Sequence, residues 1–234
     1  YSTFQKRGPV ALMLHSVGCP QPSAKVFADK WNKATAEVAV HAVLQADGTV
    51  IQCLPWNYRG IHAGGDANNT HVGVEMTEPS QIKYTTGAKF TCNNLAAARA
   101  QAEGCYKTAV ELFAMLCKKY GLDPLTDICS HAEGYKKGIA SGHGDPEHLW
   151  KGLGMSYTMD TFRKAVKAAM EPQTTHEETE EEPMTKEQIL KEVGDQYIAK
   201  LWGIKETEVY AMRKAAGITP SFRMVDTMHT GAYI

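Results

Sequence analysis

Two histidines and one aspartate are the residues of this chain best suited to hold a metal ion. His15 ends an apolar run over 12–14, and His131 directly follows a second apolar run. Asp145 lies in a loop rich in glycine, over 141–146. Two neutral imidazoles and one carboxylate can bind zinc and leave one coordination position open. Zinc held in this way can promote the attack of water on an amide bond.

Short apolar runs predict the elements that must position these residues. Strands are predicted over 10–14, 38–44, 49–54, 72–76 and 127–130, helices over 93–120 and 158–170, and a helix or irregular arm over 25–31. Asp47-Gly48 predicts a hairpin, because glycine tolerates the positive φ of such a turn. Gly121 predicts a helix end. We therefore predict an α/β domain with a mixed central sheet flanked by helices and a zinc site at strand ends.

Length, charge and cysteine usage restrict the class of protein. The chain has 234 residues and a formal net charge of −1, enough for one substantial core and a small second module. This balance gives no electrostatic reason to expect binding to nucleic acid or insertion into an anionic membrane. No apolar run approaches the roughly 18 residues that span a bilayer. The six cysteines contain no C-x-x-C pair, which favours mostly reduced thiols over a disulfide framework.

The composition changes after the predicted helix over 158–170. Residues 171–183 are rich in glutamate and lack apolar periodicity, which predicts a solvated acidic linker. An amphipathic pattern over 185–201 predicts a small, mainly helical module over 184–234. Three parts are therefore expected: a catalytic domain over 1–170, the linker and the C-terminal module.

Short motifs follow one another in order along residues 8–168. They are Leu14-His15-Ser16, Val40-His41-Ala42-Val43, Asp47-Gly48-Thr49-Val50, Ile61-His62-Ala63-Gly64, Asn69-Thr70-His71-Val72-Gly73-Val74-Glu75, Ser130-His131 and Asp145-Pro146. Each motif is weak alone, but the ordered set resembles the zinc N-acetylmuramoyl-L-alanine amidases related to peptidoglycan recognition proteins and amidase-type phage lysozymes. Residues 138–145 look especially like endolysins from phages or prophages of Gram-positive hosts.

The resemblance implies roles for individual residues. It places the ligands of one zinc ion per catalytic domain on His15, His131 and Asp145. Glu75 matches the residue that many members use as a general base on water. One branch of the family instead has tyrosine just before the histidine of the second motif, where this chain has the inert Val40.

The resemblance also concerns other polar residues of the motifs. Many relatives place an oxyanion-stabilising lysine two residues before the last ligand, where this chain has His143; an imidazolium could donate the same hydrogen bond. His41, His62 and Asn69 are candidates for substrate binding, although either histidine could instead support the ligands. His148 is more often a bystander in such a position than a fourth ligand.

These observations predict zinc-dependent hydrolysis of the amide bond between N-acetylmuramic acid and L-alanine, and therefore lysis of the cell wall. The partner would be peptidoglycan, outside the membrane, reached by an enzyme made in the cytoplasm and then released or exported. No signal peptide is visible in this sequence. The C-terminal module would target the wall or form a homo-oligomer. The alternatives are a non-catalytic peptidoglycan-binding module, which the intact ligand set disfavours, and a zinc peptidase that cuts within the stem peptide.

Overall fold

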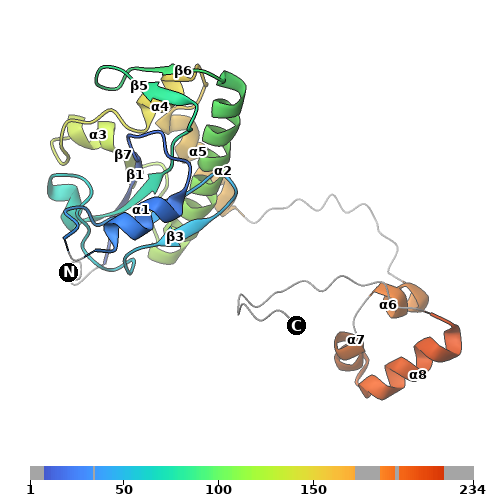
Figure 1. The fold of residues 1–234 in the computed structure, drawn as a ribbon. Coiled ribbons are helices and arrows are strands. Elements are labelled where there is room, and N and C mark those ends of the chain that lie inside the picture. The colour runs from blue at the N-terminus through green and yellow to red at the C-terminus, as the bar shows by residue number, and fades with distance from the viewer. Residues whose placement is uncertain (1–7, 34, 172–184, 193–194, 219–234) are drawn as a thin grey trace. The chain divides into compact units, whose positions relative to one another are not determined.

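A computed structural model describes residues 8–33, 35–171, 185–192 and 195–218 (Figure 1). The chain divides into two compact units, Tyr1–Gln173 and Thr174–Ile234. Apart from Glu171, the predicted acidic linker over 171–183 lies outside the described residues. None of the helices in these ranges is both long enough and apolar enough to cross a membrane.

A five-stranded mixed sheet forms the centre of the first unit. In spatial order its strands are β3 (Val50–Gln52), β2 (Ala42–Leu44), β4 (His71–Met76), β1 (Ala11–Ser16) and β7 (Ile128–Ser130). The β2–β3 pair is the predicted antiparallel hairpin, and the other neighbours are parallel. The predicted mixed sheet is confirmed. The predicted strand over 38–44 is regular only from Ala42, because Ala39 instead forms an isolated bridge with Ile61.

Helices cover both faces of this sheet, and a small hairpin stands beside it (Figure 1). The helices are α1 (Ala24–Trp31), α2 (Leu95–Tyr120), α3 (His131–Lys136), α4 (Glu147–Gly152) and α5 (Met159–Met170), with a 3-10 turn over Asp66–Asn69. The hairpin consists of β5 (Ile82–Tyr84) and β6 (Phe90–Cys92), which form a separate two-stranded sheet. The predicted helix over 93–120 begins at Leu95, and Gly121 ends it in the left-handed conformation, at φ 66°.

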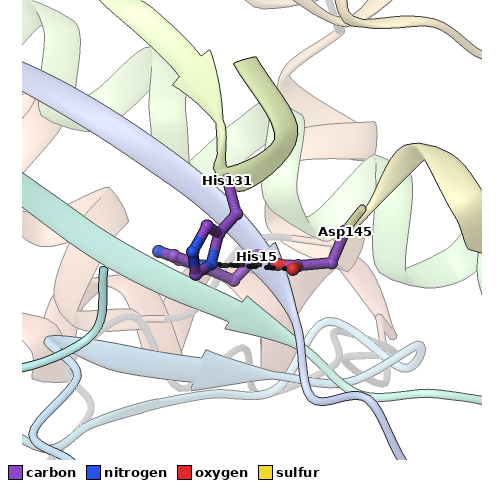
Figure 2. Close-up of side chains that lie close together, drawn as sticks. All are labelled: His15, His131 and Asp145. Atoms are coloured by element: carbon purple, nitrogen blue, oxygen red, sulfur yellow. Dashed lines mark hydrogen bonds and ion pairs between the residues drawn. The ribbon is translucent and has the colours of Figure 1, made fainter. Parts of the chain in front are cut away.

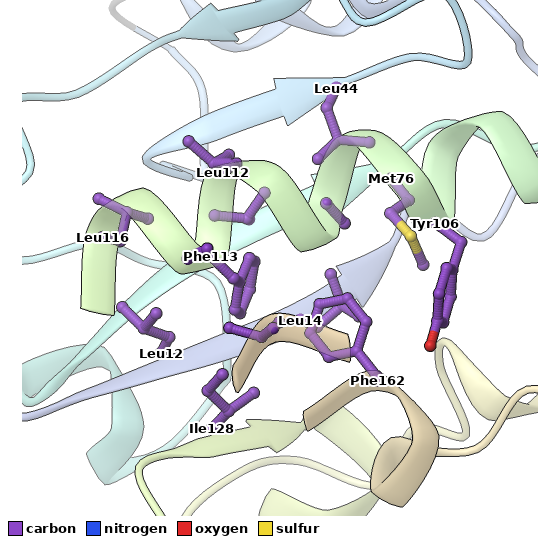
Figure 3. Packing of buried hydrophobic residues seen from close by; sticks show 14 of the residues in the cluster. Leu12, Leu14, Leu44, Met76, Tyr106, Leu112, Phe113, Leu116, Ile128 and Phe162 are labelled. Carbon is purple, nitrogen blue, oxygen red and sulfur yellow. The ribbon is translucent and has the colours of Figure 1, made fainter. Parts of the chain in front are cut away.

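The main core lies between the sheet and helices α2 and α5 (Figure 3). Leu12 and Leu14 of β1 point into it, and the rings of Phe113 and Phe162 meet edge to face with centroids 5.2 Å apart. Burial of side chains of this size contributes roughly 1.5–3 kcal/mol each. Because side chains alternate along a strand, Met13 and His15 face the opposite side of the sheet. The apolar face of β1 thus fixes the direction in which His15 points.

Within residues 185–192 and 195–218, the second unit contains three short helices. These are α6 (Lys186–Glu192), α7 (Asp195–Trp202) and α8 (Glu206–Ala216), which confirms the predicted helical character. The amphipathic run predicted through residue 201 is divided between α6 and α7. A small core contains Leu190, Ile198, Ala199 and Val209, with Trp202 packed against it. Tyr210 is 64% exposed, and the aromatic residues beyond Ile218 lie outside the described ranges.

Candidate metal centre

His15, His131 and Asp145 converge at one end of the sheet (Figure 2). Strands β1 and β7 are parallel neighbours with Leu14 opposite Ser130, so the residues that follow, His15 and His131, lie side by side. His131 is the first residue of α3, and Asp145 precedes α4. All three are buried. Parallel strands that end at a common edge therefore bring His15 next to residues that lie at least 116 positions later in the sequence.

The distances within this group match those expected for zinc ligands. Nδ1 of His15 lies 3.0 Å from Nδ1 of His131 and 3.3 Å from Oδ2 of Asp145. Nδ1 of His131 lies 3.6 Å from Oδ1 of Asp145. Two ligand atoms at the usual bond length from a tetrahedral zinc ion are about 3.3 Å apart. The residues present therefore fit the ion in both chemical type and spacing.

Hydrogen bonds fix which nitrogen of His15 faces the group. Nε2 of His62 lies 3.1 Å from the carbonyl oxygen of His71, which can only accept, so this nitrogen carries a hydrogen. Burial lowers the pKa of His62 well below its usual value, and Nδ1 of the neutral ring is then an acceptor. It lies 3.0 Å from Nε2 of His15, which therefore donates. The lone pair on Nδ1 of a neutral His15 points toward His131 and Asp145.

Gly73 in β4 makes room for this arrangement. A Cβ atom at that position would lie 2.4 Å from Cγ of His62, closer than such atoms approach in proteins. The His62 ring therefore packs directly on the backbone of β4. Asn68 holds the loop that carries His62: its buried side chain accepts hydrogen bonds at 2.8 Å from the backbone N–H groups of His62 and Ala63.

His131 is oriented in the same way by Ser141. The Ser141 hydroxyl donates to the carbonyl of Ala63 at 3.2 Å, so its oxygen accepts from Nε2 of His131 at 3.2 Å. The same oxygen accepts from Nδ1 of His143 at 3.1 Å. The two candidate histidine ligands thus use Nε2 to contact an outer partner, and their Nδ1 atoms face the candidate metal position. Such outer partners set the tautomer and ring position of metal-binding histidines.

The electrostatics of the group favour a cation. Burial alone would lower the pKa of His15, but the carboxylates of Glu75 and Asp145 outweigh it and raise that pKa. Burial likewise opposes ionisation of Asp145, yet the interaction with His15, whose Nδ1 lies 3.3 Å away, lowers the Asp145 pKa. Burial and the neighbouring His15 lower the pKa of His131 to about 4. The carboxylates therefore attract positive charge to a point where two imidazole lone pairs converge.

Glu75 lies beside this group on the same face of the sheet. It is opposite His15 in the β1–β4 register, and its Oε2 atom makes no hydrogen bond within the described residues. Burial raises the pKa of Glu75 to about 7. A carboxylate with a pKa near neutrality can both accept and return a proton under physiological conditions.

A cleft of about 720 Å³ opens onto these residues. Besides the three ligand candidates and Glu75, its lining includes His62, Tyr84, His143 and His148. His143 is exposed, and its ring centroid lies 4.6 Å from that of His131. His143 can therefore reach a substrate that approaches the metal centre.

Two residues expected to contact substrate lie elsewhere. His41 is fully buried; its Nδ1 accepts from the N–H of Gly73 at 3.0 Å, and its Nε2 donates to the carbonyl of Tyr58 at 2.6 Å. Asn69 is exposed and accepts from Arg59 at 2.6 Å. Neither belongs to the lining of the cleft: His41 joins backbone segments, and Asn69 pairs with Arg59.

Sequence reasoning missed Tyr84, which lines the cleft, and Ser141, which orients His131. His148, which the sequence analysis treated as a bystander, also lines the cleft. The spacing Ser130-x-x-Glu133 was an available signal, since it is a capping box that places His131 at a helix start. No comparable local signal indicates Tyr84, because it lies in a strand of three residues.

Comparison with known families shows the enzyme class of the chain. The sequence model of the N-acetylmuramoyl-L-alanine amidase family matches residues 5–148, more than half of the chain. The chain belongs to this amidase family. The predicted enzyme class is thereby confirmed, and the substrate class of the amidase is peptidoglycan. The matched range includes the three ligand candidates, Glu75 and His143.

Solved structures share the fold of the amidase. The Staphylococcus aureus hydrolase AmiA matches with a TM-score of 0.56 and 17% identity, over 72% of this chain and 77% of AmiA. A mutant form of PlyL matches with a TM-score of 0.51 and 16% identity, over 71% of this chain and 88% of that one. The PlyG catalytic domain gives a TM-score of 0.50 at 15% identity, over 74% and 90%.

Proposed function

We propose that this amidase depends on zinc and cuts the amide bond between the lactyl group of N-acetylmuramic acid and the L-alanine of the stem peptide. We further propose that it lyses the cell wall as an endolysin of a phage or prophage with a Gram-positive host. The observation that carries the proposal is the group of His15, His131 and Asp145, with its inward lone pairs and its 3.0–3.6 Å separations. Its site of action would be the wall outside the membrane, after synthesis in the cytoplasm and release or export.

Different side chains of the cleft carry out different parts of the proposed reaction. When bound, zinc supplies a Lewis acid that polarises the scissile carbonyl and lowers the pKa of water. Glu75 takes a proton from the attacking water and returns it to the leaving amine. His143 donates from Nε2, when protonated, to the oxygen that gains charge. The cleft walls hold the glycan and the peptide in register.

The test combines metal analysis with product analysis. The full chain should contain one zinc ion and release free amino groups from purified walls, with L-alanine as the new N-terminus. Wall binding without release would indicate a non-catalytic module. New termini within the stem peptide would indicate a peptidase. Walls from several Gram-positive species would identify the preferred host.

His143→Ala is expected to retain zinc and to lose roughly 10²–10³ in turnover, the scale of one oxyanion donor. His143→Lys should recover part of the loss, because the ammonium group can donate to the same oxygen. Turnover is measured on a soluble muropeptide, and zinc by elemental analysis of the same samples. Loss of zinc from His143→Ala would make His143 a ligand and contradict the assignment of Asp145.

The second unit is proposed to target the wall or to form a homo-oligomer. A chain that ends at Met170, the last residue of α5, is expected to fold, bind zinc and hydrolyse soluble muropeptides normally. It should act more slowly on intact walls, because a lost second contact lowers the effective concentration at the surface. Equal rates of the short and full chains on walls would contradict targeting, and light scattering of both would test the oligomer.

A further inference from the structure

Glu78 is a buried carboxylate beside the candidate metal centre, and it has no part in the proposed mechanism. It is 0% exposed and follows β4. Its Oε1 atom accepts from the hydroxyl of Ser16 at 2.7 Å and from the N–H of Gly18 at 3.1 Å. Its Oε2 atom accepts from the hydroxyl of Tyr84 at 2.7 Å. Three donors from two separate segments therefore converge on one carboxylate.

Tyr84 extends this chain of hydrogen bonds to α4. Its oxygen lies 2.6 Å from Nε2 of His148. The Tyr84 hydrogen is already donated to Glu78, so the hydrogen in this second bond must come from His148. The direction of the chain is therefore fixed, from His148 through Tyr84 to Glu78.

Both ends of the chain adjoin candidate ligands. Ser16 directly follows His15, and its backbone N–H donates to Oδ2 of Asp145 at 3.3 Å. At the other end, the backbone N–H of His148 donates to the carbonyl of Gly144, the neighbour of Asp145. The contacts thus close a ring that runs from Glu78 to Ser16, on to Asp145 and His148, and back through Tyr84.

Burying the polar groups of this ring costs more free energy than apolar packing at the same place would. A carboxylate without access to water is unfavourable unless hydrogen bonds replace its hydration. Apolar residues of similar volume often stabilise a protein as well as a buried charge does. The polar ring nevertheless gives something that apolar packing lacks, since its directed bonds specify the positions of the segments they join.

We propose that Glu78 is a positioning residue for the metal centre, fixing the end of β1 that carries His15 relative to the start of α4 beside Asp145, with Tyr84 as the link. The inference rests on the proposed zinc function. Glu78 itself does not line the cleft and acts through the residues that it holds.

Two variants break the ring at different points. Tyr84→Phe removes the link to His148 but leaves Glu78 bonded to Ser16 and Gly18. Glu78→Gln replaces one acceptor by a donor, so Tyr84 must turn its hydrogen toward His148, which then carries its own hydrogen on Nδ1. Tyr106→Phe is the matched control, because it also removes a tyrosine hydroxyl, but from the main core, where the aromatic ring of Tyr106 stacks on that of Tyr157.

The experiment measures metal binding by the full chain. Zinc affinity, from competition with a chelating dye, should fall roughly 10–100-fold in Tyr84→Phe and in Glu78→Gln, the usual effect of losing an outer partner of a ligand. The visible spectrum of the Co²⁺-loaded variants should also change, and ¹⁵N NMR should show His148 moved to the Nδ1–H tautomer in Glu78→Gln. Tyr106→Phe should match the unmodified chain in affinity and spectrum.

The outcomes separate this inference from the proposed function. Unchanged zinc affinity and an unchanged Co²⁺ spectrum in both variants would overturn the positioning role while leaving the zinc enzyme intact. An unmodified chain that binds neither metal would overturn both proposals. If Glu78→Gln did not fold, as judged by circular dichroism, Tyr84→Phe would decide the matter alone, because it leaves the buried carboxylate with its other two donors.

Discussion

Replacement of Asp145 by alanine is expected to remove bound zinc and to abolish hydrolysis of the amide bond. His15→Ala and His131→Ala should give the same result, because three protein ligands leave no redundancy. Loss of the ion removes several kcal/mol of transition-state stabilisation as well as the activation of water, and about 1.36 kcal/mol corresponds to each factor of ten in rate. Elemental analysis and turnover on a soluble muropeptide measure the two effects.

His71→Ala provides the matched control for the histidine variants. The His71 side chain lies outside the ligand group, while its backbone carbonyl, which the substitution retains, accepts the hydrogen bond from His62. This variant should therefore keep both zinc and activity. Stoichiometric zinc in all three ligand variants would overturn the assignment of the metal centre. Thermal unfolding should accompany the assay, since losing a metal site can also destabilise the fold.

Glu75→Gln is expected to keep zinc and wall binding but to lower turnover by roughly 10²–10⁴, the scale of lost general-base catalysis. The amide has nearly the same size as the carboxylate and cannot accept the proton from water. The effect should appear in kcat more than in KM, because the lost interaction belongs to the chemical step. Steady-state kinetics on a soluble muropeptide, with zinc analysis of the same sample, test this expectation.

Glu103→Gln is the corresponding control for charge removal. Glu103 lies on α2 and forms an exposed i,i+4 pair with Lys107, remote from the ligand group in the fold. Its substitution should leave kcat unchanged. Near-normal turnover of Glu75→Gln would instead assign Glu75 a structural role.

The convergence of the three candidate ligands could be predicted from sequence because these residues follow regular elements. His15 and His131 each follow an apolar run, and parallel neighbouring strands bring their ends to one edge of a sheet. The fold class was predictable for the same reason, since the strands of the main sheet and the two long helices have clear periodicity. The hairpin turn at Gly48 and the helix end at Gly121 were local signals of backbone conformation.

The outer parts of the site could not be predicted because they depend on contacts between distant segments. His62 and His41 occur in similar apolar surroundings in the sequence, yet one lines the cleft and the other joins backbone segments. Tyr84 comes from a strand of three residues, too short to show a period, and its partner His148 is 64 residues away. Such pairings follow from the tertiary packing of loops, which local patterns do not encode.

The close packing of His62 on Gly73 has a consequence for how this sequence can diverge. Gly73 is not a proposed metal ligand and does not itself line the cleft, so a comparison based on chemistry alone would treat position 73 as free to vary. Any side chain there would displace His62, and with it the acceptor that orients His15. Among descendants of this sequence, a glycine in the middle of β4 should therefore persist as long as the histidines do, while the neighbouring valines can exchange with other β-branched residues.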